Sequence, residues 1–237
     1  WLQGLSTRDK ASFRMMFHSK ALVFTTLALP TIAFVSYGTS VWTAPFLIRV
    51  HGVTVADVGW YVGIGNAIGG LIGVVMGGML ADRMKLYFVN GRLMIGIVTI
   101  LLTAPLILWM VKTEDLMTAY WLNFAYHIPA SMWVSIAPAT VNDLVMPRMR
   151  ATAGAWFLLM NTIIGLALGP YAMGRLSDMF IAGGADSGAA LSQAIAWGQC
   201  IFILTAILLA LAMRYLPDDE ASRLDRARAL GESFDQK

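Results

Sequence analysis

Apolar residues gather in six long runs along the chain, separated by short polar or glycine-rich connections. About 20 residues of α-helix cross a hydrocarbon core of roughly 30 Å, and each run is long enough to do so. The pattern predicts an all-α membrane protein with six transmembrane helices near residues 21–50, 58–80, 93–111, 117–141, 153–176 and 194–216. Because the connections are short, we expect one bundle over 21–216, preceded by a linker or surface helix at 1–20 and followed by a tail at 217–237.

The second run carries a glycine every four residues, at Gly65, Gly69, Gly73 and Gly77. This spacing puts the glycines on one helix face, where the missing Cβ lets a neighbouring backbone approach closely. A shift of 96 residues superposes the pattern on the fifth run, where Gly165 and Gly169 occupy equivalent positions. The same glycine, leucine and aspartate spacing ends both stretches, at 78–82 and 174–178. We therefore predict an internal repeat of three helices and a helix-packing role for these six glycines.

Composition and charge agree with a membrane location. Of the 237 residues, 58% are hydrophobic and 13% are charged, about half the charged fraction of a soluble domain. With six spans, all basic residues except Arg49, Lys112 and Arg175 fall on the side that holds both chain ends, so the positive-inside rule predicts cytoplasmic termini. The basic residues are scattered over short loops, which gives no support for nucleic-acid binding.

Two of the runs carry polar faces. Asn123, His127, Ser131 and Ser135 follow one another every four residues in the fourth run, and Ser36, Ser40 and Thr43 share a face of the first. Polar groups in hydrocarbon cost free energy unless they meet a partner or water. We expect a substrate cavity lined by Ser36, Tyr37, Ser40, Thr43, Asn123, Tyr126, His127, Ser131 and Ser135. The third and sixth runs have few polar residues and are expected to be outer helices that face lipid.

These polar residues leave two alternatives open. Serine and threonine hydroxyls can bond carbonyls of their own helix, which would give them no role in a cavity. His127, with an ordinary pKa of about 6.5, can take part in proton coupling or contact an anionic head group, or can be a neutral side chain bonded to a neighbouring helix.

An intramembrane enzyme is disfavoured, and no cofactor or metal is expected. Such an enzyme needs catalytic groups that face one another. His127 and Ser131 lie on one face of one helix, so their side chains point in parallel, and Asp143 has no second carboxylate beside it in the sequence.

Several motifs resemble those of the major facilitator superfamily of transporters. The run GGMLADR at 77–83 is similar to the signature that follows the second helix of a half, and GRLSD at 174–178 echoes it. The usual signature continues at once with glycine and basic residues, whereas seven residues intervene here before Gly91 and Arg92. Within the superfamily, SYGTSVWTAPFLIRVHGVTVADVGWYVG (36–63) and PRMRATAGAWFLLMNTIIGLALGPYAMGRLSD (147–178) resemble the carboxy-terminal half of bacterial spinster-like transporters.

The resemblance implies two inverted three-helix repeats that form one half of a carrier, with an amino-terminal six-helix half as partner. It also implies alternating access, coupling to protons, and amphiphilic substrates such as sphingolipids or lysophospholipids, in the lipids of a bacterial inner membrane. Asp82 would act as a conformational latch with Arg83 and Arg92, because a carboxylate is attracted to the free N–H groups of a helix N-terminus in the other half.

Two other assignments remain open. One is a carrier of small organic anions, although no Lys or Arg lies at mid-membrane depth in this sequence. The other is a six-helix protein that works as a homodimer, without a second half.

Overall fold

The described part of the chain is helical, in agreement with the predicted fold class. The computed structural model describes residues 17–222, with the side chain of Arg148 excepted, so most of the predicted linker and tail lie outside the described residues. In chain order the described elements are α2 (Lys20–His51), α3 (Val55–Tyr87), α4 (Gly91–Met110), α5 (Leu116–Ser131), α6 (Trp133–Leu144), η2 (Pro147–Met149), α7 (Arg150–Met160), η3 (Asn161–Leu168), α8 (Gly169–Ala182), α9 (Ser187–Gly198) and α10 (Ile201–Ala221).

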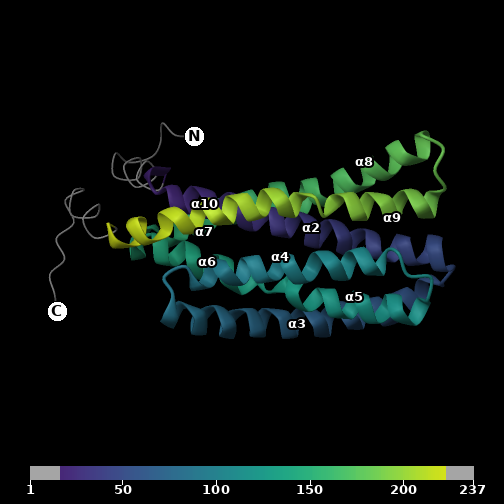
Figure 1. Cartoon of the computed structure of the whole chain (residues 1–237), viewed down its shortest axis with the longest axis horizontal. Coiled ribbons are helices and arrows are strands. Elements are labelled where there is room, and N and C mark those ends of the chain that lie inside the picture. The colour runs from purple at the N-terminus through teal and green to yellow at the C-terminus, as the bar shows by residue number, and fades with distance from the viewer. Residues whose placement is uncertain (1–16, 223–237) are drawn as a thin grey trace.

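These helices form the six predicted spans, side by side along the long axis in Figure 1. The first three spans are single helices, and the other three are interrupted. The fourth divides at Met132 into α5 and α6, three residues after Pro129, which has no backbone N–H to continue the helical ladder. The fifth contains the π-helical segment η3, and the sixth breaks at Gln199 and Cys200. Five spans are long and apolar enough to cross a bilayer, and the divided fourth is the exception.

The sixth span is longer than the sequence predicts at both ends. It begins at Ser187, because Asp186 caps α9 by accepting a hydrogen bond from the Gly188 amide at 2.9 Å. The small residues in the first turn of α9 have low hydropathy, so the hydropathy pattern places the start of this span too late. At the other end α10 continues through Pro217 to Ala221. Asp219 then accepts hydrogen bonds from Ser19 Oγ (2.9 Å) and from the Ala21 amide (2.7 Å), so the last turn of α10 caps the start of α2.

Helix contacts follow the predicted repeat. Helix α3 packs on α5, and correspondingly η3 and α8 pack on α2; α10 packs on α2, as α4 packs on α5. The first triplet is α2, α3 and α4, and the second is formed by the fourth, fifth and sixth spans. When one triplet is superposed on the other, the contact of α3 with α5 corresponds to that of η3 and α8 with α2, and the contact of α4 with α5 corresponds to that of α10 with α2. Each triplet crosses the bundle an odd number of times, so the two run in opposite directions. Figure 1 shows the result, with α3 and α8 at opposite margins and both described ends of the chain at the same end of the bundle.

Glycines form the closest contacts between the triplets. A Cβ on Gly73 would overlap the carbonyl of Ile128, and a Cβ on Gly169 would overlap the carbonyl of Phe34. The neighbouring glycines are also closely packed. A Cβ on Gly69 would lie 3.0 Å from Phe124 O, a Cβ on Gly77 would lie 2.7 Å from Met132 Cα, and a Cβ on Gly165 would lie 2.7 Å from Ala33 Cβ. Only Gly65, among the six, has room for a Cβ at ordinary contact distance. Both interfaces are therefore backbone-to-backbone.

Replacing Gly73 with alanine should destabilise the bundle, because the new methyl group requires α3 to move away from α5. We expect Gly73→Ala to lower the free energy of unfolding by about 1–3 kcal/mol, the usual cost of overpacking. Thermal unfolding of the full-length protein in detergent, followed by tryptophan fluorescence, measures the effect.

The matched control is Gly63→Ala in the same helix, where nothing lies within 4 Å of the added Cβ. Alanine there gains helix propensity of up to about 1 kcal/mol. Equal melting temperatures for the two variants would show that the glycine face is not under steric constraint.

Candidate functional site

The polar stripe of the fourth span lies against α3. Asn123 Nδ2 donates a hydrogen bond to Asn66 Oδ1 of α3 at 2.9 Å, and both Asn123 and His127 are buried. His127 Nδ1 lies 2.9 Å from the Asn123 carbonyl oxygen. A carbonyl can only accept, so Nδ1 carries the proton, and in the neutral ring Nε2 is the acceptor. The stripe thus meets partners at its buried end, and one of them, Asn66, is not among the predicted site residues.

The two serines of the stripe continue along the same interface. If Gly70 carried a Cβ, that atom would lie 3.6 Å from Ser131 Oγ. A Cβ on Gly78 would lie at the same distance from Ser135 Oγ. Ser135 also donates to the carbonyl of Met132 in its own span at 3.0 Å. Both serines remain half-buried, so their hydroxyl groups lie at the edge of the contact between α3 and the fourth span.

The polar face of α2 contacts the fourth span. Ser36 Oγ donates to the Ala130 carbonyl at 3.1 Å, and the ring of Tyr37 packs edge-on against Trp133. Thr43 donates to the Thr39 carbonyl of its own helix at 2.8 Å and lies 3.3 Å from the hydroxyl of the buried Tyr126. Thr43 and Ser135 thus bond carbonyls of their own span, as one of the two alternatives expected. Ser36 instead donates its hydrogen bond to a carbonyl of α5.

The nine predicted cavity residues lie on α2 and on the fourth span and differ in accessibility. Thr43, Asn123, Tyr126 and His127 are buried within the bundle. The half-buried members, which a ligand can reach more readily, are Ser36, Tyr37, Ser40, Ser131 and Ser135. That these residues line a cavity in the working protein stays a prediction.

A pocket of about 400 Å³ opens between α3 and α5, next to the Asn66–Asn123 pair. Its lining is aromatic and aliphatic: Trp60, Tyr61, Ile64, Gly65, Ile68, Met117, Tyr120, Trp121 and Phe124. Tyr61 and Tyr120 stack with their ring centroids 4.7 Å apart. Such a surface offers an apolar chain many contacts, whereas Asn66 and Asn123 lie behind the lining and are not part of it.

Charged side chains from four spans meet at the end of the bundle that holds the chain ends. Arg92 of α4 forms ion pairs with Asp82 of α3 (2.8 Å) and with Asp143 of α6. Lys85 of α3 lies 3.5 Å from Asp143 and 2.8 Å from Glu220 of α10. We call these five residues the charge network. The side chain of Arg92 is 18% exposed, whereas that of Asp82 is 68% exposed, so the network has one open end at Asp82.

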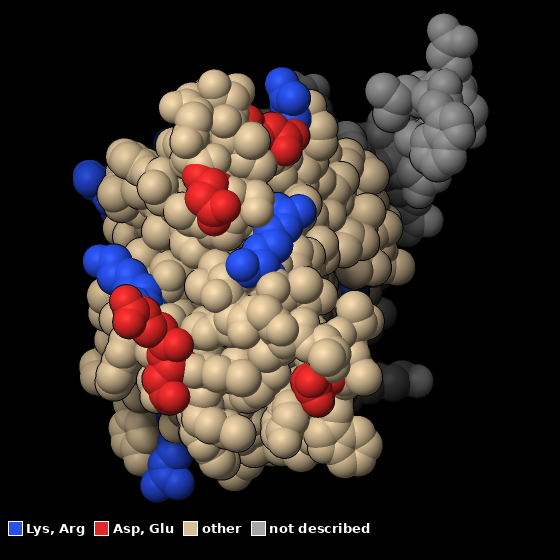
Figure 2. All heavy atoms as spheres, turned by 90° about the vertical axis from the view of Figure 1, so that its right-hand side faces the viewer, with Lys and Arg blue, Asp and Glu red and all other residues tan. Residues whose placement is uncertain are grey.

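The charge network refines the sequence analysis in two ways. Asp143 is flanked by other carboxylates in space, although none is near it in the sequence, and a cation separates it from each. Arg83, grouped with Asp82 and Arg92 in the predicted latch, is exposed and makes no ion pair within residues 17–222. The opposite end of the bundle, in Figure 2, shows only dispersed basic and acidic side chains on a mostly uncharged surface.

Comparison with known proteins matches this architecture. The family model described as Major Facilitator Superfamily matches residues 3–170. An MFS-type efflux pump of Mycolicibacterium smegmatis is 31% identical over 150 residues, covering 62% of this chain and 34% of the pump. Protein spinster homolog 3 of Homo sapiens is 28% identical over 214 residues, covering 80% of this chain and 42% of that protein.

A solved structure gives the same result. The crystal structure of a bacterial homolog to the human lysosomal transporter Spinster, inward-facing and unoccupied, matches with a TM-score of 0.67 and 25% identity, over 94% of this chain and 53% of that one. The chain therefore belongs to the Major Facilitator Superfamily, and its relatives include spinster proteins. It spans between 30% and 53% of the length of these relatives, with the fold of one half of such a transporter.

Removing Arg92 should weaken the end of the bundle that holds the charge network. Arg92→Gln removes the ion-pair partner of Asp82 and the shorter of the two ion pairs of Asp143 with Arg92 and Lys85. For these partly exposed pairs we expect a loss of roughly 1–2 kcal/mol, measured by thermal unfolding in detergent at low and high salt. Arg83→Gln is the matched control and should be neutral. A loss of the same size in both variants would contradict a specific role for the network.

Proposed function

We propose that this chain is the carboxy-terminal half of a secondary transporter that moves amphiphilic, lipid-like substrates, such as lysolipids or sphingolipids, by alternating access coupled to protons. Its partner in this proposal is an amino-terminal six-helix half, and its setting is a bacterial inner membrane with both termini cytoplasmic. The family and fold, which are those of a transporter, support this reading over an enzyme.

The observation that carries the lipid substrate is a charge-free interior. In the described spans no Asp, Glu, Lys or Arg lies within residues 21–48, 58–81, 93–111, 116–142, 153–174 or 188–213. A mid-membrane cation, which would favour a small organic anion, is therefore missing from this half. The aromatic pocket between α3 and α5 instead suits the apolar chain of a lipid-like substrate.

The arrangement of the spans supports a contact with a second half. In an apolar 18-residue stretch of α2, 67% of the residues are buried, whereas the share is 22% for such a stretch of α3 and 17% for one in the span from α7 to α8. Helices α3 and α8 of these two spans lie at opposite margins of the bundle in Figure 1, and both spans present apolar side chains outward. They are the surfaces on which the other half would rock. Asp82, exposed beside Arg92, would hold a helix N-terminus of that half in one of the two states.

Transport of purified full-length protein in proteoliposomes tests the substrate class directly. With an imposed pH gradient, we expect uptake of a radiolabelled lysolipid well above protein-free vesicles and no uptake of a small organic phosphate. Abolition of lysolipid uptake by a protonophore would support proton coupling. Uptake of the organic phosphate alone would contradict the lipid assignment and favour the organic-anion carrier.

Replacement of His127 tests its part in coupling. Glutamine keeps a hydrogen-bond donor for the Asn123 carbonyl but does not titrate, so His127→Gln should flatten the dependence of transport on pH while the protein stays folded. The control is His51→Gln at the end of α2, which should leave the profile unchanged. An unaltered pH profile in His127→Gln would make His127 a packing residue.

A further inference from the structure

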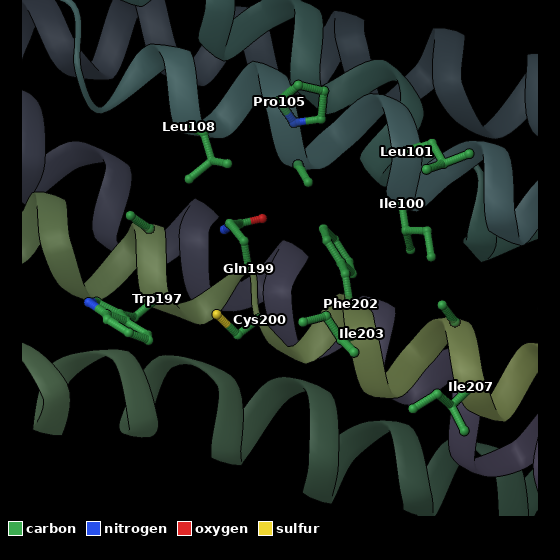
Figure 3. Close-up of a pocket in the computed structure, with 13 residues that line it drawn as sticks. Ile100, Leu101, Pro105, Leu108, Trp197, Gln199, Cys200, Phe202, Ile203 and Ile207 are labelled. Carbon is green, nitrogen blue, oxygen red and sulfur yellow. The ribbon is translucent and has the colours of Figure 1, made fainter.

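An apolar groove of about 800 Å³ lies between α4 and the sixth span, at the break between α9 and α10 (Figure 3). Its volume is within the range of roughly 300–1,000 Å³ typical of small-molecule sites. The floor consists of residues that are almost inaccessible, Ile100, Gln199 and Phe202, each 5–6% exposed. The rim consists of Leu101, Trp197 and Ile203, each more than 60% exposed. The groove is therefore open on one side and carries a single polar side chain at its floor.

The helix break fixes the orientation of the Gln199 amide. The backbone N–H of Gln199 donates to Ala196 O, three residues back, so Ile195 O loses its usual helical donor. The side-chain Nε2 of Gln199 replaces that donor at 3.0 Å. The amide is thereby held with Oε1 on the side away from Ile195. Figure 3 shows this amide between α4 and the sixth span, near Leu108 and Phe202.

Gln199 Oε1 has no hydrogen-bond donor in the described part of the chain and is buried. A buried acceptor without a partner costs the free energy of its desolvation. The groove thus presents this acceptor, Gln199 Oε1, in a hydrocarbon-lined space. Water is a poor occupant, because it needs two to four polar partners.

We propose that this groove binds a long-chain alcohol, an apolar chain whose single O–H donates a hydrogen bond to Gln199 Oε1. The chain lies on Ile100 and Phe202 and is covered at the rim by Trp197 and Ile203. A plain alkyl or acyl chain fits the same apolar surface but leaves Oε1 without a donor, so the groove prefers the hydroxylated ligand. Its access from lipid requires that α4 and the sixth span face outward, and so rests on the proposed function, in which the other half packs on α3 and on the span from α7 to α8.

Photolabelling of the full-length protein in phospholipid nanodiscs tests the proposal. The probe is dodecanol that carries a diazirine in its chain, and labelled peptides are mapped by mass spectrometry. We expect labels on peptides of α4 and of the sixth span. Unlabelled dodecanol should protect these peptides at about tenfold lower concentration than dodecane, the fold-change that one buried hydrogen bond produces.

Gln199→Leu and Gln199→Met remove the acceptor and keep the bulk of the side chain, so in both the preference for dodecanol over dodecane should disappear. Gln193→Leu, at an exposed glutamine of α9, should keep it. Two substitutions at position 199, each checked for an unchanged melting temperature, separate loss of binding from loss of folding.

Equal protection by dodecanol and dodecane in the unmodified protein would overturn the proposal, as would an undiminished preference in both Gln199 variants. Absence of any label on these peptides would also overturn it, because the groove would then be covered by protein. If selective labelling is observed but lysolipid transport is not, the proposed function fails and the groove assignment stands.

Discussion

Contact between glycine and a carbonyl of a neighbouring helix is the constraint on which this structure depends. In a bilayer, lipid tails are as apolar as leucine, so helices gain little from burying apolar surface against one another and associate through close packing. Gly73 against Ile128 and Gly169 against Phe34 allow the backbones to approach without a layer of side chains. Gly73 and Gly169 are equivalent under the internal repeat, and their partners lie on the corresponding fourth and first spans. One kind of contact, used twice in opposite orientations, therefore joins the two triplets.

The same interface positions the polar residues. Asn123, His127 and Ser131 lie on the face of α5 that the α3 glycines approach, so the polar stripe lies where α3 comes closest. Rigid contacts of this kind leave little freedom between helices. The breaks in the fourth, fifth and sixth spans then become the places where a helix can bend, and the π-helical segment η3 lies in the span that contacts α2 through Gly165. The charge network joins the ends of α3, α4, α6 and α10 at a distance from this interface.

Much of the fold could be predicted from the sequence, because it is encoded in short-range patterns. Hydropathy gave the six spans, and the spacing of glycine predicted the face that α3 turns to α5. The helix interruptions were not predicted. The position of Pro129 could have indicated the break in the fourth span. At the break in the sixth span, the side chain of Gln199 replaces a backbone donor, and such a replacement leaves no signal in the hydrophobic periodicity. The start of the sixth span was placed too late, because Asp186 acts through a local cap and not through hydropathy.

The candidate site was predicted in part. The polar faces of α2 and α5 were recognised from spacing, but their partners come from other helices. Asn66 pairs with Asn123 across 57 residues, and Lys85 pairs with Glu220 across 135. A single sequence contains no signal for such pairing. For Asn66 the lone amide in a glycine-rich apolar helix was a usable hint, since a polar group in hydrocarbon needs a partner.

A cryo-electron microscopy structure of the full-length protein in nanodiscs tests the central claim most directly, through the Cα distances of Gly73 to Ile128 and of Gly169 to Phe34. The account predicts that both pairs are in backbone contact and that the two triplets superpose after a half-turn about an axis in the membrane plane. A layer of side chains between either pair, or triplets that superpose only in parallel orientation, would contradict it.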